Sequence, residues 1–248
     1  MRYFIELAYN GKAYHGWQIQ PNAVTVQETL ENAFSMVLRK KTEVVGAGRT
    51  DTGVHASQYF AHFEAEEIAE KDKLIYNLNS ILPKDIAVYR ILKVGEQAHA
   101  RFDALNRSYE YRIIRHKDPF ENETAHFVKI PIDVERMNRA ASILMQYKDF
   151  KCFSRSRTDV KTFNCEILSA EWKEIGNLLV FNITADRFLR NMVRAIVGTL
   201  LEVGLGKISE EDLNNIIKSR DRQNAGTSVP AKALFLKDIQ YPESIFRE

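Results

Sequence analysis

The residues best suited to chemistry lie in one short segment, Gly46-Ala47-Gly48-Arg49-Thr50-Asp51-Thr52-Gly53-Val54-His55-Ala56. Its three glycines within eight residues indicate a tight turn, because glycine adopts backbone conformations that strands and helices do not use. Asp51 in such a turn could act as a nucleophile, a base or an electrostatic stabiliser, and we expect Arg49 to hold its carboxylate in the ionised form. A purely structural turn is the alternative, since Asp and Thr side chains often bond their own backbone.

Several known motifs share residues with this segment but do not fit it. The Rossmann fingerprint needs a third glycine where Asp51 stands, and a P-loop needs Lys-Ser/Thr where Val54-His55 stands. His55 and His62 do not have the spacing of the zinc-binding motif His-Glu-x-x-His. Asp51-Thr52-Gly53 matches the tripeptide of aspartic proteases, which need two carboxylates that share one proton. The neighbouring Arg49 opposes that sharing.

Composition limits the class of protein. With 248 residues, 45% hydrophobic and 27% charged, the chain is expected to form a packed core rather than to be disordered. The net charge of +2 means that any nucleic-acid-binding surface must be a local cluster. Cys152 and Cys165 fit no metal or disulfide framework. No segment has the character of a signal peptide or a membrane span, so we expect a cytoplasmic protein.

Basic and aromatic residues gather at two places. Tyr109 and Tyr111 share one face of a predicted strand, and cations surround that strand: Arg101, Arg107, Arg112, Arg115, His116 and Lys117. Rings for bases and cations for phosphates suit RNA, although core tyrosines beside a solvated basic face would look the same. The second place is a predicted helix on which three arginines recur at i, i+3 and i+7: Arg187, Arg190 and Arg194. Such a stripe indicates an anionic ligand or, alternatively, simple solvation.

The apolar pattern predicts two halves with one order of elements, strand-helix-strand-strand-helix-strand, over residues 1–103 and 104–248. The first half contains a strand at 3–9, a helix capped by Thr25, strands at 43–45 and 58–63, a helix at 71–81 and a strand at 86–94. The second contains a strand at 108–115, a helix capped by Asp133 that runs to about 147, a hairpin over 167–173 and 177–184, a helix at 187–203, a short helix capped by Ser209, and a strand at 232–241.

Two such units predict an α+β fold of two ferredoxin-like halves with a mixed, mostly antiparallel sheet. No linker rich in Pro, Gly or Ser separates the halves, so we expect them to pack as one body. A basic central cleft between them is the expected site, with the Asp51 loop in the first half and the second half completing it.

The chain resembles the tRNA pseudouridine synthase A family. Gly48–Ala56 resembles the catalytic signature of that family, and further matches follow in order over nearly the whole chain: Tyr9–Gln18, Thr25–Gln27, Ala100–Ala104, Tyr109–Arg112, Phe188–Arg194 and Ala233–Leu236. The chain departs from the usual pattern at three positions: Thr52, where alanine is frequent, Ala233, where glycine is frequent, and Cys165, where arginine is often found.

The resemblance implies an enzyme that isomerises uridine to pseudouridine at positions 38, 39 and 40 of the tRNA anticodon stem-loop. It implies a homodimer that needs no metal, redox cofactor or nucleotide. Asp51 would be the nucleophile, with Arg49 and Arg194 as further catalytic residues, while Tyr109 and Leu234 would contact the target base. Five arginines would contact the RNA: Arg101, Arg155, Arg157, Arg187 and Arg190.

Two alternatives stay open on the sequence alone. One is an RNA-binding or tRNA-folding protein whose catalysis is secondary or lost, although an intact Arg49-Thr50-Asp51 argues against loss. The other is a glycoside hydrolase acting on a small nucleoside, which would need a second carboxyl group that the sequence does not place. The sequence decides neither whether Asp51 attacks the ribose or the uracil ring, nor whether Tyr109 or Tyr111 faces the base.

Overall fold

The computed structural model describes residues 1–155 and 160–246. The chain divides into two compact units. One unit comprises Met1–Leu105 together with the segment that begins at Leu236, and the other comprises Asn106–Phe235. Within the described ranges, no helix combines the length and the apolar composition that a membrane crossing requires.

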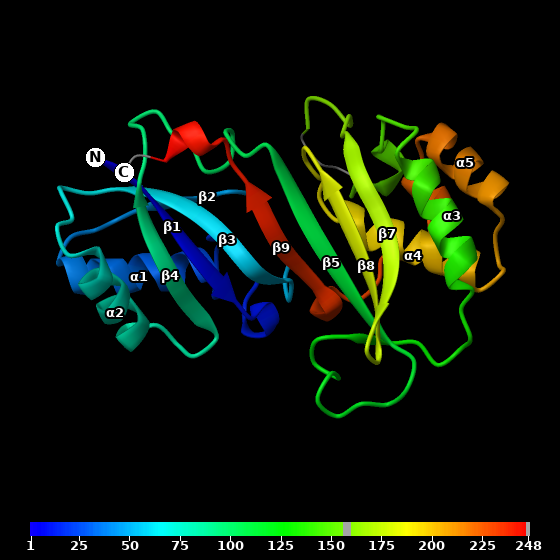
Figure 1. Cartoon of the computed structure of the whole chain (residues 1–248), viewed down its shortest axis with the longest axis horizontal. Coiled ribbons are helices and arrows are strands. Elements are labelled where there is room, and N and C mark those ends of the chain that lie inside the picture. Colours follow the sequence, from blue (N-terminus) through cyan, green and yellow to red (C-terminus); the bar gives the residue numbers. More distant parts are fainter. Residues whose placement is uncertain (156–159, 247–248) are drawn as a thin grey trace. The chain divides into compact units, whose positions relative to one another are not determined.

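The first unit has the predicted order of elements. They are β1 (Arg2–Tyr9), the 3-10 turn η1 (Gly11–Ala13), α1 (Val26–Leu38), β2 (Val44–Gly46), β3 (His55–Glu64), α2 (Lys71–Ile81) and β4 (Ile86–Lys93). Strand β1 pairs antiparallel with β3 and β4, and β2 pairs antiparallel with β3. Strand β9 (Leu234–Gln240) enters this unit at Leu236 and follows β3 in the sheet order. Helix α2 packs on β4 and α1 packs on α2, beside these strands in Figure 1.

Helix α1 is held by its apolar face. Four of its side chains are buried, and they lie at the spacing of one helical face: Val26, Leu30, Ala33 and Phe34. The ring of Phe34 packs against Phe63 of β3, with ring centroids 4.6 Å apart. Burying a side chain of this size contributes about 1.5–3 kcal/mol. This packing fixes α1 against the strand pair that carries the Asp51 loop.

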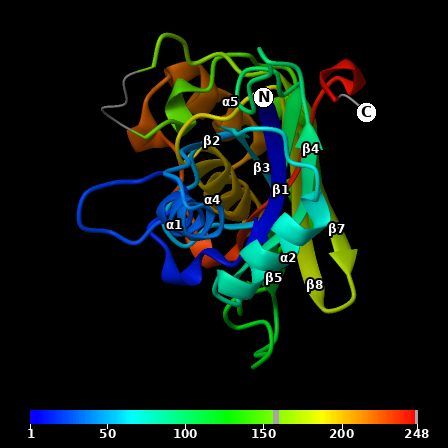
Figure 2. The same cartoon turned by 90° about the vertical axis from the view of Figure 1, so that its left-hand side faces the viewer.

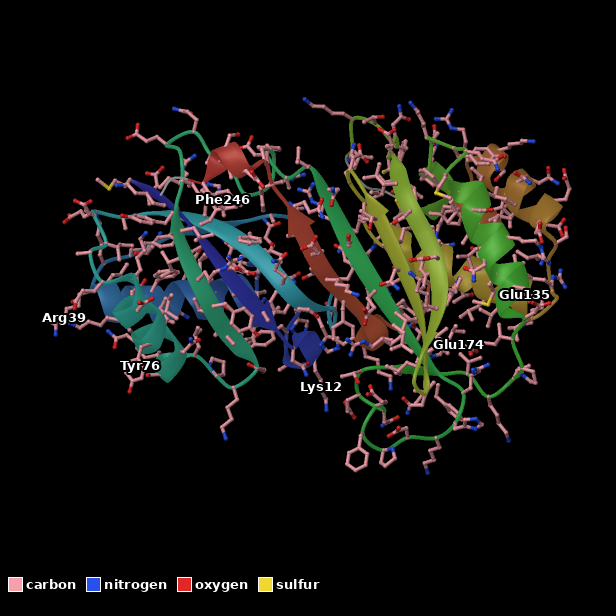
Figure 3. The ribbon with its side chains drawn as sticks, in the orientation of Figure 1. Lys12, Arg39, Tyr76, Glu135, Glu174 and Phe246 are labelled. Atoms are coloured by element: carbon pink, nitrogen blue, oxygen red, sulfur yellow. The ribbon has the colours of Figure 1, made fainter. Side chains whose placement is uncertain are left out.

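The end of the chain completes the core of the same unit. Phe246, labelled in Figure 3 within the short turn η5 (Glu243–Ile245) and its cap, lies edge-on to Phe4 with ring centroids 6.2 Å apart. The Tyr241 ring lies 5.1 Å from the Phe4 ring. The backbone N–H of Ile239 donates a hydrogen bond to the Gln58 side chain of β3 at 3.0 Å. The residues after Leu236 therefore close one edge of this sheet and its aromatic cluster.

The second unit follows the predicted order up to its last strand, with two additions, β6 and α5, while most of that last strand, β9, belongs to the first unit. Its elements are β5 (Asn106–Ile114), β6 (His126–Phe127), α3 (Val134–Leu144), η2 (Lys151–Phe153), β7 (Ile167–Ile175), β8 (Leu178–Ala185), α4 (Met192–Gly204), α5 (Glu210–Ser219), η3 (Arg222–Asn224) and η4 (Ala231–Ala233). Strand β8 pairs antiparallel with β5 and β7, and β6 pairs parallel with β5. Helix α3 packs on β7, α4 and α5. The predicted α+β fold with mostly antiparallel pairing is confirmed.

The three predicted helix caps are confirmed. The side chain of Thr25 accepts the Glu28 N–H at 3.3 Å, and that of Asp133 accepts the Arg136 N–H at 2.9 Å. The Ser209 side chain accepts the Asp212 N–H at 3.1 Å, and the Ser209 backbone N–H donates to the Asp212 carboxylate at 2.8 Å, which completes a capping box. Each such cap contributes about 1 kcal/mol, because it satisfies an N–H group that has no partner inside the helix.

The predicted start of the fourth helix is wrong. Helix α4 begins at Met192 rather than at Arg187. Asn191 has a φ angle of 66°, in the left-handed region that an α-helix does not use. Its side-chain amide donates to Ser228 Oγ at 2.6 Å, which holds the chain in this conformation. A hydrogen bond across 37 residues, invisible to local periodicity, therefore sets the helix boundary.

The later start also overturns the predicted arginine stripe. Of the three arginines, only Arg194 lies in α4, whereas Arg187 and Arg190 precede it. The carbonyl oxygen of Arg190 accepts the backbone N–H of Arg155 at 3.0 Å, so this backbone group is used outside any helix. Arg187 and Arg190 therefore do not form one helical face with Arg194.

A buried histidine makes the first unit sensitive to acid. His62 of β3 accepts the Ala100 N–H at Nδ1 (3.2 Å), and burial, helped by His99 and Arg2, lowers the pKa of His62 from 6.5 to about 4. The unfolded chain therefore binds this proton more readily, and stability is lost as pH falls from about 6.5 towards 4. Between pH 7 and pH 5, we expect the wild type to lose about 1–2 kcal/mol more unfolding free energy than His62→Gln.

Urea titrations at both pH values measure this difference. His116→Gln is the matched control, since His116 is exposed on the surface, and it should behave as the wild type does. Equal acid sensitivity in the wild type and in His62→Gln would show that His62 does not carry the effect.

Candidate active site

The segment with the chemistry-bearing residues forms the loop between β2 and β3. Its first residues are fastened to β3: the Ala47 N–H donates to the Phe60 carbonyl at 2.9 Å, and the Tyr59 hydroxyl donates to the Gly48 carbonyl. The Gly48 N–H points back at the same hydroxyl, 3.3 Å away. The backbone that leads to Asp51 is therefore held in place before the chain reaches it.

Three aromatic rings pack against one another and against the start of this loop. Trp17 stacks on Tyr59 with ring centroids 4.1 Å apart, and Tyr9 lies edge-on to Tyr59 at 5.6 Å. A Cβ atom on Gly46 would lie 2.3 Å from both Trp17 Nε1 and the Tyr59 hydroxyl. The glycine at this position is thus required by close packing, and any larger residue would displace the rings that support the loop.

The segment over 10–18, which precedes α1, supplies the other wall of the loop. A Cβ atom on Gly16, where φ is +87°, would lie 2.2 Å from the Thr50 carbonyl oxygen. The Trp17 N–H donates to Thr50 Oγ1 at 3.1 Å, and the Tyr9 hydroxyl lies 3.0 Å from the same atom. Sequence reasoning missed this scaffold, although the glycine and aromatic residues of Tyr9–Gln18 were its signal.

Asp51 lies at the turn of this braced loop. Its carbonyl oxygen accepts the Val54 N–H at 3.1 Å, and Gly53, with φ at +77°, donates its N–H to the Tyr14 carbonyl at 3.2 Å. The Asp51 residue is half-buried. A carboxylate on a rigid, partly exposed turn suits attack on a bound substrate, because little reorganisation precedes the reaction.

Arg49 does not pair with Asp51, contrary to the expectation from the sequence. Among the residues described, the hydrogen-bond partner of the Arg49 side chain is Gln18, whose Oε1 accepts the Arg49 Nε–H. Arg49 is exposed and the loop between η1 and α1, which contains Gln18, projects outward in Figure 2. The guanidinium is therefore held by a neutral amide and not neutralised by the neighbouring carboxylate.

His55 has a structural role. Its side chain is buried, and Nδ1 accepts the Gly11 N–H at 3.0 Å. A Cβ atom on Gly11 would lie 1.9 Å from the Val54 carbonyl oxygen, so the two segments are in direct contact there. His55 thus fastens the end of the loop to η1.

In the second unit, Arg194 lies in the first turn of α4 and is half-buried. Its Nε–H donates to the Val229 carbonyl at 2.7 Å, and its own carbonyl accepts the Val229 N–H at 3.2 Å. This pair of bonds fixes both the backbone and the guanidinium plane. Arg222 holds the same segment, since it donates to the carbonyls of Ala225 and Gly226 at 3.1 Å, so its guanidinium is used within the protein.

The structure separates the two tyrosines of β5. Tyr111 is fully buried, its hydroxyl donates to the Pro230 carbonyl at 3.1 Å, and burial raises the pKa of Tyr111 above its ordinary value although Arg194 opposes the shift. Tyr109 is half-buried, with its ring edge-on to Phe188 at 5.0 Å. Tyr109 therefore keeps exposed area, whereas Tyr111 belongs to the core.

The remaining candidates differ in exposure. Leu234 is buried at the start of β9, directly after η4. Arg101 is exposed and lies over the Phe102 ring, with its guanidinium carbon 5.4 Å from the ring centroid. Arg155 and Arg190 are also exposed, Arg187 is half-buried, and Arg157 lies outside the described residues. The structure thus leaves the side chains of three of these arginines open to solvent.

Neither cysteine is suited to chemistry. Cys152 and Cys165 are free and buried, and burial raises the pKa of each thiol to about 12. A thiol of this kind stays protonated near neutral pH and is a poor nucleophile. Cys165 is therefore a small core residue rather than a catalytic thiol.

The fold and this loop define a class of enzyme that has two α+β units and carries a carboxylate on a braced turn. Comparison with known proteins identifies the member of that class. A family model described as tRNA pseudouridine synthase matches residues 7–103 and 140–242. The chain is 54% identical over 246 residues to "tRNA pseudouridine synthase A" of Parabacteroides distasonis, covering 99% of this chain and 98% of that protein.

Two further relatives carry the same description. The identity is 53% over 250 residues for Bacteroides thetaiotaomicron, covering 100% of this chain and 93% of that protein. The identity is 40% over 239 residues for the protein of Thermoanaerobacter sp. strain X514, covering 96% of this chain and 98% of that protein. The chain belongs to the tRNA pseudouridine synthase family. Its family model covers Asp51, Arg194 and Leu234.

Thr50 offers a test of the scaffold beneath the loop. Thr50→Val keeps the shape but removes the acceptor of the buried Trp17 N–H, so we expect about 1–3 kcal/mol less unfolding free energy. We also expect kcat to fall about tenfold, since Asp51 follows directly in the chain and would be displaced. Urea unfolding and kinetics of tritium release from tRNA labelled at uridine C5 measure both effects.

Thr52→Val is the control for Thr50→Val, because Thr52 is exposed two residues further on and should tolerate the change. Unchanged kcat in Thr50→Val would show that the hydroxyl does not position the loop.

Proposed function

We propose that this enzyme isomerises uridine to pseudouridine at positions 38, 39 and 40 of the tRNA anticodon stem-loop, with Asp51 as the nucleophile. The observation that carries the proposal is the family match over residues 7–103 and 140–242, which includes the braced loop around Asp51. The carboxylate on a rigid turn supplies the nucleophile that the reaction needs.

The reaction rearranges one nucleotide without any external reactant. The bond between C1′ of the ribose and N1 of uracil breaks, the uracil turns, and a bond forms between C1′ and C5. The proton on C5 leaves to solvent, and N1 gains a proton. An ionised Asp51 serves attack on either the ribose or the uracil ring, because both routes need an electron pair from the carboxylate.

The other proposed site residues act on the bound nucleotide. Arg194, whose guanidinium is fixed by the Val229 carbonyl, supplies a positive charge to the reaction, and Arg49 holds the nucleotide after it leaves its stack. The half-buried Tyr109 stacks on the uracil, and Leu234 packs against it.

The RNA is bound by its backbone rather than by its sequence. In this proposal Arg157 contacts the phosphates of the RNA, and so do four arginines that the structure describes: Arg101, Arg155, Arg187 and Arg190. Such contacts position the RNA by shape, which suits an enzyme that modifies three neighbouring nucleotides. We further propose that the enzyme works as a homodimer in the cytoplasm, which light scattering and fractionation of cells measure directly.

The test uses tRNA transcripts labelled with tritium at uridine C5. Three transcripts each carry one uridine among positions 38, 39 and 40 of the anticodon arm, at a different position in each. A fourth transcript carries cytidine at all three positions. We expect tritium release from the first three, pseudouridine mapped to the remaining uridine, and no release from the fourth.

Two results would contradict the proposal. Release from the transcript that lacks all three uridines would place the reaction elsewhere in the tRNA. Absence of release from every transcript, with binding retained, would favour an RNA-binding or tRNA-folding protein instead.

A further inference from the structure

Gln18 makes a contact that the reaction described so far does not use. Its Oε1 accepts the Nε–H of Arg49, although 31 residues separate the two along the chain. The residues that precede Gln18 also contact the loop that carries Asp51. Gly16 packs against the Thr50 carbonyl, and the Trp17 N–H donates to Thr50 Oγ1 at 3.1 Å. Three successive residues of one segment therefore contact two successive residues of the other.

The segment that carries Gln18 is itself fixed to the fold. The N–H of Ile19 donates to Gln27 Oε1 at 3.1 Å. Gln27 in turn donates to the Val44 carbonyl of β2 at 3.0 Å, and β2 leads directly into the loop. The residues before and after Gln18 are thus both held by hydrogen bonds, Trp17 to Thr50 and Ile19 to Gln27. The side-chain oxygen of Gln18 therefore has a defined position relative to Arg49.

This contact leaves one side of the Arg49 guanidinium for a ligand. A guanidinium offers two paired sets of donors, one including Nε and one made by the two terminal amino groups. Gln18 occupies the Nε side, and no bond from the terminal amino groups of Arg49 to any described residue is present. Because Arg49 is exposed, those amino groups are accessible to a pair of acceptor oxygens on an RNA.

We infer that Gln18 is a positioning residue for the reaction: it fixes the Arg49 guanidinium so that its two terminal amino groups bind acceptor oxygens of the RNA beside the target nucleotide. This inference rests on the proposed function. A neutral amide suits the task, because it orients the guanidinium without cancelling its charge. An acidic partner such as Asp51 would compete with the RNA for the same donors.

The test compares Gln18→Leu with Gln18→Glu in the full-length enzyme. Gln18→Leu removes the acceptor, and we expect kcat for tritium release to fall about tenfold while KM stays within about twofold. Gln18→Glu keeps the acceptor oxygen but adds a negative charge that competes with the RNA, so kcat should stay within about threefold of the wild type while KM rises. Gln20→Leu is the matched control, because the Gln20 side chain bonds the His15 carbonyl instead, at 2.7 Å.

A second background separates positioning from damage to the fold. Arg49→Lys has no Nε–H, so adding Gln18→Leu to it should lower kcat by less than about twofold further. Full activity of Gln18→Leu, an equal loss in both backgrounds, or equal loss in Gln18→Glu and Gln18→Leu would each overturn the inference.

Nuclear magnetic resonance tests the contact without any activity. The Nε–H of Arg49 should exchange slowly with water in the wild type and in Gln20→Leu, and quickly in Gln18→Leu. Fast exchange in the wild type would overturn the inference even if the enzyme is active. Slow exchange in a wild type that releases no tritium would refute the proposed function and leave the Gln18 contact intact.

Discussion

Asp51→Asn should reduce tritium release from tRNA by about 10⁴-fold or more, while tRNA binding is kept. An amide has the size of the carboxylate but no electron pair of comparable nucleophilicity. The loop should keep its shape, since backbone bonds and the Thr50 side chain brace it: Ala47 to Phe60, Gly53 to Tyr14, Val54 to the Asp51 carbonyl, and Trp17 to Thr50. The loss should therefore appear in kcat.

Single-turnover tritium release and filter binding measure the two quantities separately. Asp72→Asn is the matched control, because Asp72 is exposed on α2 and is expected to leave both quantities unchanged. Release that survives in Asp51→Asn would keep the enzyme but assign its nucleophile to another residue. If Asp51→Asn lost tRNA binding as well as tritium release, Asp51 would be needed for binding the tRNA rather than for the chemical step.

Arg194→Lys should reduce kcat by about 10²–10³-fold although the positive charge is retained. The Nε–H of Arg194 donates to the Val229 carbonyl at 2.7 Å, which orients the guanidinium from the first turn of α4. Lysine carries its charge on one flexible ammonium group, which can bind that carbonyl or support a carboxylate but lacks the planar pair of donors. A conservative change in charge is thus a large change in geometry.

The control for Arg194→Lys is Arg139→Lys on α3, where the exposed Arg139 bonds Glu210 at 2.8 Å. It should alter neither kcat nor the urea midpoint. If Arg194→Lys kept wild-type kcat, charge alone would suffice. A fall in the urea midpoint that matches the fall in kcat would show that the Val229 contact is needed for folding.

Local sequence patterns determined the order of elements in this protein. Periodic apolar residues located α1 and the hairpin of β7 and β8, and the capping residues Thr25, Asp133 and Ser209 located three helix starts. These signals are readable because each depends on residues within a few positions of one another. The glycine spacing around Asp51 identified the turn for the same reason, and the ordered resemblance to one family indicated its chemistry.

Contacts between distant residues decided the rest. Asn191 ends the extended segment before α4 through Ser228, and this moved Arg187 and Arg190 off the predicted helix. Tyr109 and Tyr111 have the same parity in β5, yet only tertiary packing buries Tyr111 under Pro230.

The partner of Arg49 shows the same limit most clearly. The nearest acid in the sequence is Asp51, but the folded chain brings Gln18 to the guanidinium from 31 residues away. Periodicity and spacing describe what one segment can form by itself. The pairing of side chains depends on which segments the fold brings together, and that information is distributed over the whole chain.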